Sequence, residues 1–165
     1  MRDVLHLWLL AAQLGYVDMH NVFLLGVSRG GMMTYLALKH QMPVNAAAVI
    51  GGPTDLIAQS RERPALMTQI FKQLIPDFET DAEVRLRERS AIYWPEQITV
   101  PVLIMHGGMD WRVEPRSQAL ALAHRLHEQH KTYELVIYTQ DDHDLSLNRV
   151  DSERRSVEWF KRHMK

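Results

Sequence analysis

A serine flanked by glycines, in the Gly-x-Ser-x-Gly pattern of residues 26–30, constrains the fold more than any other feature of the sequence. It follows the apolar run Val22–Leu25 and precedes a helix-forming segment. An apolar run without polar residues is typical of a strand buried on both faces of a parallel sheet. The pattern predicts a tight, strained strand-to-helix turn, with Ser28 at its tip and with Gly26 and Gly30 leaving room where the two segments crowd.

Apolar runs and helix-forming segments alternate along the rest of the chain. The further predicted strands are Ala46–Ile50, Val100–Met105 and Tyr133–Tyr138. The predicted helices are Asp3–Leu14, Gly30–His40, Pro115–His130 and a C-terminal helix. The first has an apolar stripe of Leu7, Trp8, Ala11 and Leu14, and Gly15 follows it as a left-handed cap. In the last two, the residues predicted to face inward are Ala119, Leu122, Ala123 and Leu126, and then Val157, Phe160 and Met164. One helix followed by four strand–helix repeats predicts an α/β fold, a parallel sheet flanked by helices.

The segment Pro53–Gln97 interrupts this regular alternation. It is rich in Arg and Glu and is predicted to form two helical pieces, with Thr80 and Glu83 spaced as a capping box. Helical insertions of this kind usually serve as long crossover connections, and a lid over a site is the alternative. A length of 165 residues suits one domain or a large piece of one, so we expect residues 1–165 to form a single, whole or partial domain.

Charge and composition exclude several classes of function. Nineteen Lys and Arg residues against 20 Asp and Glu give a net charge of -1, so we expect neither nucleic acid nor a membrane as a partner. The absence of cysteine excludes disulfides, Cys-ligated metals and a thiol nucleophile. The stretch after Met1 is too short to span a bilayer and has no cleavage site, so we expect a cytoplasmic protein, with a signal upstream of Met1 left open.

The turn at residues 26–30 makes Ser28 a candidate nucleophile. A serine hydroxyl needs a histidine base and an acid that orients the histidine, and in a parallel sheet all three meet at the carboxyl ends of the strands. Asp110 follows the strand Val100–Met105, and His143 follows Tyr133–Tyr138. The helix that begins after Ser28 offers the Arg29 backbone N–H to a developing oxyanion.

Each of these residues also has a structural interpretation. Ser28 fits a simple turn, Asp110 fits the cap of the following helix, and His143 fits a solvated loop. Three rival acids adjoin His143 in sequence, where they rarely point at its ring: Asp141, Asp142 and Asp144.

Two further groups of residues carry weaker signals. The set His124, His127 and His130 has a spacing that drifts around a helix, so we expect surface histidines and no metal site. Trp111 and Arg112 follow the candidate acid and have two interpretations. They are either substrate contacts, or a packed tryptophan and a solvated arginine with no role in binding.

The chain resembles the catalytic domain of the prolyl oligopeptidase family of serine hydrolases, within the α/β-hydrolase superfamily. The resemblance rests on Leu14-Gly15-Tyr16-Val17-Asp18, on Gly26 to Gly31, on the segment from Val100 to Asp110 and on His143. It implies that Ser28 is the nucleophile, Asp110 the triad acid and His143 the general base, with the chain order Ser, Asp, His, and it implies no cofactor. Arg29, where many relatives have an aromatic residue, and Asp144, where many have glycine, depart from the pattern.

The resemblance also implies that the chain is the C-terminal part of the fold, lacking the upstream strands and the loop that gives a second oxyanion donor. The strand Val22–Leu25 is then expected to be an exposed edge, to which a second copy or the missing N-terminal half could pair. The expected activity is cleavage of small peptides or esters through an acyl-enzyme, with peptidase favoured by resemblance. The alternatives are a carboxylesterase or dienelactone-hydrolase-like enzyme, and a non-catalytic remnant that acts through association.

Overall fold

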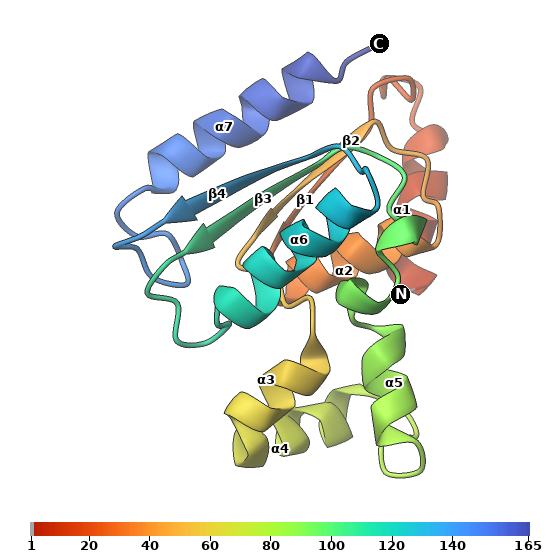
Figure 1. The fold of residues 1–165 in the computed structure, drawn as a ribbon. Helices are drawn as coiled ribbons and strands as arrows, with labels where there is room; N and C mark the ends of the chain where they lie inside the picture. The colour runs from red at the N-terminus through yellow and green to blue at the C-terminus, as the bar shows by residue number, and fades with distance from the viewer. Residues whose placement is uncertain (1) are drawn as a thin grey trace.

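The computed structural model describes residues 2–165 and contains one parallel sheet of four strands in the order β1-β2-β3-β4 (Figure 1). The strands are β1 (Phe23–Val27), β2 (Ala46–Ile50), β3 (Val102–Gly107) and β4 (Tyr133–Tyr138). All four strands predicted from the sequence are present, and β1 and β3 lie slightly later than predicted. The sheet therefore has the order expected from successive strand–helix repeats, and β3 extends through His106.

Helices cover both faces of the sheet, as the α/β prediction requires (Figure 1). The helices α1 (Arg2–Ala12), α2 (Arg29–Lys39) and α6 (Ala121–Glu128) lie on one face, and α7 (Arg149–Arg162) lies on the other. Alternate strand residues separate into the two layers: Ile104 packs with α2 and α6, whereas Leu103 and Met105 pack with α7. The absence of polar residues in β2 and at the start of β3 follows from this double coverage.

The first helix contacts the core less extensively than predicted. It ends at Ala12, before the predicted Leu14, and Gly15 has no left-handed backbone. Trp8 packs against the core as expected, but Leu7 and Leu14 are exposed. Leu7 and Leu14 are exposed because α1 contacts the core through a different set of residues, Val4, Leu5 and Trp8.

The inward face of α7 also differs from the prediction. Ser152, Ser156 and Trp159 are buried, whereas Val157 and Met164 are exposed. The two serine hydroxyls donate to carbonyls of their own helix, which satisfies them in an apolar layer. Small polar residues thus occupy the close contact with the sheet, and an apolar pattern alone does not find them. Phe160, also predicted to face inward, is half-buried and stacks on Phe23 at a centroid distance of 4.9 Å.

The predicted helix Pro115–His130 divides into two parts. A π-helical turn, η3 (Arg116–Leu120), precedes α6, and the predicted apolar stripe of Ala119, Leu122, Ala123 and Leu126 is buried as expected.

The segment between β2 and β3 is a long connection with its own small core. It comprises α3 (Leu56–Glu62), α4 (Pro64–Leu74), α5 (Ala82–Glu88) and two 3₁₀ turns, η1 (Ala91–Tyr93) and η2 (Pro95–Gln97). Its core residues are Leu56, Ile57, Met67, Phe71, Ile75 and Leu86. The capping box predicted at Thr80 and Glu83 is wrong: Asp81 precedes α5 without a side-chain cap, and Glu83 pairs with Arg87. The segment connects β2 to β3, as the crossover interpretation requires.

One edge of the sheet consists of β1, as expected from the sequence. Within residues 2–165, β1 pairs only with β2, and Leu25 and Val27 are 53% and 47% exposed. In the described part of the chain, no helix combines the length and apolar character that a membrane crossing requires.

Candidate active site

Ser28 lies at a strained turn between β1 and α2. Its φ of 53° is in the left-handed region, which is unfavourable for a residue with a side chain and is typical of functional turns. The turn is held to the sheet by the Ser28 N–H, which donates to the Ile50 carbonyl at 2.8 Å. A side chain at Gly26 would overlap the Gly30 carbonyl and Thr34, so the prediction for Gly26 is confirmed. Gly30 has open space around it, so the predicted crowding at Gly30 is wrong.

The three residues singled out by the sequence come together at the carboxyl edge of the sheet. The Ser28 hydroxyl lies 2.9 Å from His143 Nε2, and His143 Nδ1 lies 2.7 Å from Asp110 Oδ2. Because a carboxylate only accepts hydrogen bonds, His143 donates from Nδ1 and its Nε2 is free to accept from the serine. Asp110 and His143 are buried, at 1% and 6% exposed.

Close packing between two loops brings His143 to Asp110. The loop after β4 crosses directly over the end of β3, where a side chain at Gly107 would overlap the carbonyl of Asp142. The Gly108 N–H donates to Tyr138, and the Met109 N–H donates to Asp141. The glycine pair after His106 therefore lets the loops that carry the acid and the histidine touch.

The carboxylate of Asp110 accepts hydrogen bonds through both oxygens. Oδ1 accepts from the N–H groups of Arg112 and Val113, each at 2.9 Å, and Oδ2 lies near His143 and also 3.1 Å from His106 Nε2. Burial alone would raise the pKa of Asp110, but the hydrogen bonds from His106, His143 and Val113 outweigh it and hold this pKa well below its ordinary value. The group is thus kept as an anion beside His143.

His106 is the neighbour of the site that sequence reasoning missed. Its position was visible in the segment His106-Gly107-Gly108-Met109-Asp110, but its contact with Asp110 depends on the turn that folds the loop back over β3.

The rival acids are occupied elsewhere. Asp141 accepts from the backbone of Leu147 and Asn148, and Asp142 accepts from Ser146. Asp110 also makes the local turn that its alternative interpretation suggested, through Oδ1, but no helix starts there and Oδ2 faces His143.

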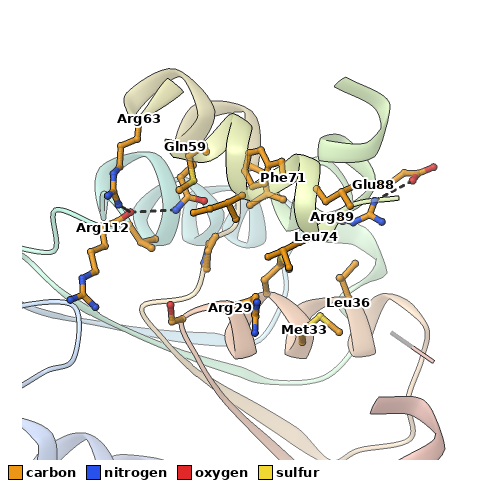
Figure 2. A pocket seen from close by; sticks show the side chains of 18 of the residues that line it. Arg29, Met33, Leu36, Gln59, Arg63, Phe71, Leu74, Glu88, Arg89 and Arg112 are labelled. Carbon is orange, nitrogen blue, oxygen red and sulfur yellow. Dashed lines mark hydrogen bonds and ion pairs between the residues drawn. The ribbon is translucent and has the colours of Figure 1, made fainter. Parts of the chain in front are cut away.

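A cavity of about 1020 Å³ opens beside Ser28 and His143 (Figure 2). Its floor is α2, including Arg29, Met33 and Leu36, and its roof is formed by α3 and α4, with Gln59, Phe71 and Leu74. Apolar side chains thus line most of the space between the serine and the roof. The segment Pro53–Gln97 therefore covers the site as well as connecting two strands.

The roof of this cavity is tied to the loop that carries the acid. Gln59 and the Arg63 guanidinium donate to the Arg112 carbonyl at 3.3 and 3.4 Å (Figure 2). Trp111 is 68% exposed and lies against the guanidinium groups of Arg63 and Arg112, so its predicted packing in the interior is wrong. Arg112 lines the cavity.

Two other sequence predictions concern Arg29 and the three histidines in α6 and just after it. Arg29 is the first residue of α2, so its N–H has no partner within the helix and lies next to Ser28. His124, His127 and His130 are exposed, as expected for surface residues. Among residues 2–165 no group of His, Cys, Asp and Glu has the arrangement of a metal site.

Comparison with known proteins finds one family model and two curated relatives that match most of the chain. A sequence model of the prolyl oligopeptidase family matches residues 1–165. Dipeptidyl peptidase family member 6 of Caenorhabditis elegans is 26% identical over 147 residues, which cover 86% of this chain and 20% of that protein. Acylamino-acid-releasing enzyme 2 of Oryza sativa subsp. japonica is 24% identical over 169 residues, which cover 91% of this chain and 21% of that protein. The chain thus spans about a fifth of the length of these curated relatives.

A solved structure of a puromycin-hydrolyzing peptidase from Mycobacterium tuberculosis has the same fold. The TM-score is 0.83 at 20% identity, and the match covers 98% of this chain and 25% of the other. Residues 2–165 therefore have the architecture of part of an α/β-hydrolase fold.

Proposed function

We propose that this chain, which belongs to the prolyl oligopeptidase family, is a serine hydrolase that cleaves peptide or ester bonds by acyl transfer to Ser28. The observation that carries the proposal is the continuous line of hydrogen bonds from the Ser28 hydroxyl through His143 to Asp110. Ser28 is the nucleophile, His143 the general base and Asp110 the residue that holds the imidazole in the required tautomer.

The reaction proceeds in two halves. The Ser28 oxygen attacks the substrate carbonyl carbon while its proton passes to His143 Nε2. The oxyanion that develops is stabilised by the N–H of Arg29 and the positive end of α2. His143 then gives its proton to the leaving amine or alcohol, and an acyl group remains on Ser28. Water, deprotonated by His143, attacks this ester; collapse of the second tetrahedral intermediate releases the acid and returns the proton to Ser28.

The cavity indicates the kind of group that the substrate carries. Met33 and Leu36 on the floor and Phe71 and Leu74 on the roof favour an apolar acyl group or side chain next to the scissile bond. Membership of the family favours peptide substrates. The hydrogen-bonded residues Ser28, His143 and Asp110 can cleave esters by the same steps, so the experiment uses both kinds of substrate.

The experiment compares turnover of p-nitrophenyl esters and of peptide p-nitroanilides by the wild-type protein and Ser28→Ala. We expect an initial burst of p-nitrophenol, equal in amount to the enzyme, followed by slower turnover, because the acyl-enzyme accumulates with a good leaving group. Ser28→Ala should show neither phase and should keep the same circular dichroism spectrum. Equal rates in the two proteins would remove Ser28 from the reaction. Cleavage of esters without cleavage of any anilide would favour the esterase alternative.

A further inference from the structure

His106 is a buried, titratable residue that the reaction above does not use. It lies at the end of β3 and is fully buried. Its Nε2 is 2.8 Å from the Val113 carbonyl oxygen and 3.1 Å from Asp110 Oδ2. The His106 ring therefore lies between the end of the central strand β3 and the loop that carries Asp110.

The contacts of His106 determine which nitrogen carries the hydrogen. A carbonyl oxygen only accepts, so His106 Nε2 must donate to Val113. The same N–H lies within reach of Asp110 Oδ2, as in a bifurcated hydrogen bond. The other nitrogen, Nδ1, is buried and has no partner among residues 2–165, which disfavours a second hydrogen there. His106 thus donates through Nε2.

We propose that His106 is a positioning residue of the site: its Nε2–H, shared by Asp110 Oδ2 and the Val113 carbonyl, fixes the acid in the orientation that His143 needs. This inference rests on the proposed function, because the orientation of Asp110 affects a rate only if His143 acts as the base.

The physical basis is the number of donors around Asp110. The N–H groups of Arg112 and Val113 hold Oδ1, but both belong to the same loop as the carboxylate. His106 alone ties this carboxylate to the sheet through a side chain of β3, which is hydrogen-bonded to β2 and to β4. Without this donor the loop retains its local turn, while the direction of Oδ2 toward His143 is less well defined. The expected loss is therefore in the chemical step rather than in substrate binding.

Other charged groups near the site pair elsewhere or line the cavity. Arg112 reaches Asp144, with a nitrogen–oxygen distance of 3.8 Å, and Arg29 and Arg63 line the cavity on the side of α2 and α3. None of these groups donates to Asp110 through its side chain in the described part of the chain.

The test compares His106→Gln, which can still donate from Nε2, with His106→Met, which cannot. We expect His106→Met to lower kcat about tenfold, with KM within about twofold, because a hydrogen bond to a charged group is lost. His106→Gln should recover most of kcat. Rates are expressed per active site counted with a fluorophosphonate, so that misfolded protein does not contribute. His124→Met, on an exposed face of α6, is the matched control and should equal the wild type. Equal kcat for the Gln and Met variants, or a change confined to KM, would overturn the proposal.

A second measurement does not depend on activity or on the variants folding. In wild-type protein with ¹⁵N-labelled histidine, nuclear magnetic resonance should show a His106 ring with hydrogen on Nε2 and none on Nδ1. A ring with hydrogen on Nδ1 and none on Nε2 would overturn the proposal even if the enzyme is active. If the wild-type protein has the expected His106 tautomer but fails to turn over substrate or react with the fluorophosphonate, the proposed function fails instead.

Discussion

Asp110 is the residue whose chemistry is most sharply defined by its surroundings, because one carboxylate oxygen faces His143 and the other faces the backbone N–H groups of its own loop. Asp110→Asn would present an amide to His143 and favour the wrong imidazole tautomer. We expect kcat for ester hydrolysis to fall by about 10⁴ with the fold intact, measured by steady-state kinetics and circular dichroism.

Asp142→Asn is the matched control for this variant. Asp142 accepts hydrogen bonds from Ser146 and the Asp144 N–H, and an asparagine oxygen can still accept them. Activity should stay within about threefold of the wild type. If Asp142→Asn were the more damaging change, the assignment of Asp110 as the acid would be wrong.

The stability of the protein in acid should also depend on Asp110. The pKa of Asp110 is held below its ordinary value of 3.8 in the folded chain, so the carboxylate contributes stability above that value and loses it as the pH falls. The difference in free energy of unfolding between wild type and Asp110→Asn should therefore shrink from about pH 5 to about pH 2, as measured by urea denaturation. A difference that stays constant over this range would contradict the stabilising hydrogen bonds at Asp110.

At the level of elements, the helices α3 and α4 define the roof of the cavity. Leu74 on α4 lines the cavity and is 51% exposed, so its side chain can change without disrupting the core. Leu74→Gln should lower kcat/KM for a long-chain p-nitrophenyl ester about tenfold, since a contact of this size is worth roughly 1.5 kcal/mol, and should leave the acetate ester nearly unchanged.

Val157→Gln is the matched control for the roof. Val157 is 50% exposed on α7, across the sheet from the cavity. The kcat/KM values of Val157→Gln for the long-chain ester and for the acetate ester should equal those of the wild type. Equal losses for long and short esters in Leu74→Gln would show that α4 does not contact the acyl group.

The elements also show what the sequence could predict. The sequence predicts β2 and β3 from apolar runs that are typical of strands buried on both faces, and it predicts α6 from a regular apolar stripe. The inward face of α7 was missed because Ser152 and Ser156 are buried by satisfying their hydroxyls within the helix. An apolar pattern carries no information about such local hydrogen bonds.

For the site, the sequence predicted which residues meet but not all that surrounds them. Ser28 follows β1, Asp110 follows β3 and His143 follows β4, so the parallel topology alone brings the three residues to one edge of the sheet. The contact between His106 and Asp110, and the roof over Ser28, depend on loop paths that no spacing rule gives. The Gly-x-Ser-x-Gly pattern predicts crowding at both glycines, but only a side chain at Gly26 would overlap its neighbours, Gly30 and Thr34.

For the whole molecule, the feature with the largest consequence is the edge of β1 that has no strand partner within residues 2–165. The strand has no charged residue, and Leu25 and Val27 are half exposed, so nothing on this edge opposes pairing with another strand. We expect the wild-type protein to associate with a second copy through β1 as concentration rises, measured by sedimentation velocity.

Leu25→Lys should reduce this association, because a charge on an edge strand opposes pairing. The control is Leu120→Lys, which makes the same substitution at a position 45% exposed on η3. A wild-type protein that stays monomeric at high concentration, or association equally weakened by both variants, would contradict a role of the β1 edge.

The central claim is that Ser28, activated by His143 and Asp110, is a working nucleophile. The most direct measurement is the intact mass of the folded protein after incubation with a fluorophosphonate, with Ser28→Ala treated in parallel. The account predicts one phosphonyl adduct per chain, located at Ser28 and absent from Ser28→Ala. A folded wild-type protein that stays unlabelled, or an equal adduct on Ser28→Ala, would contradict it.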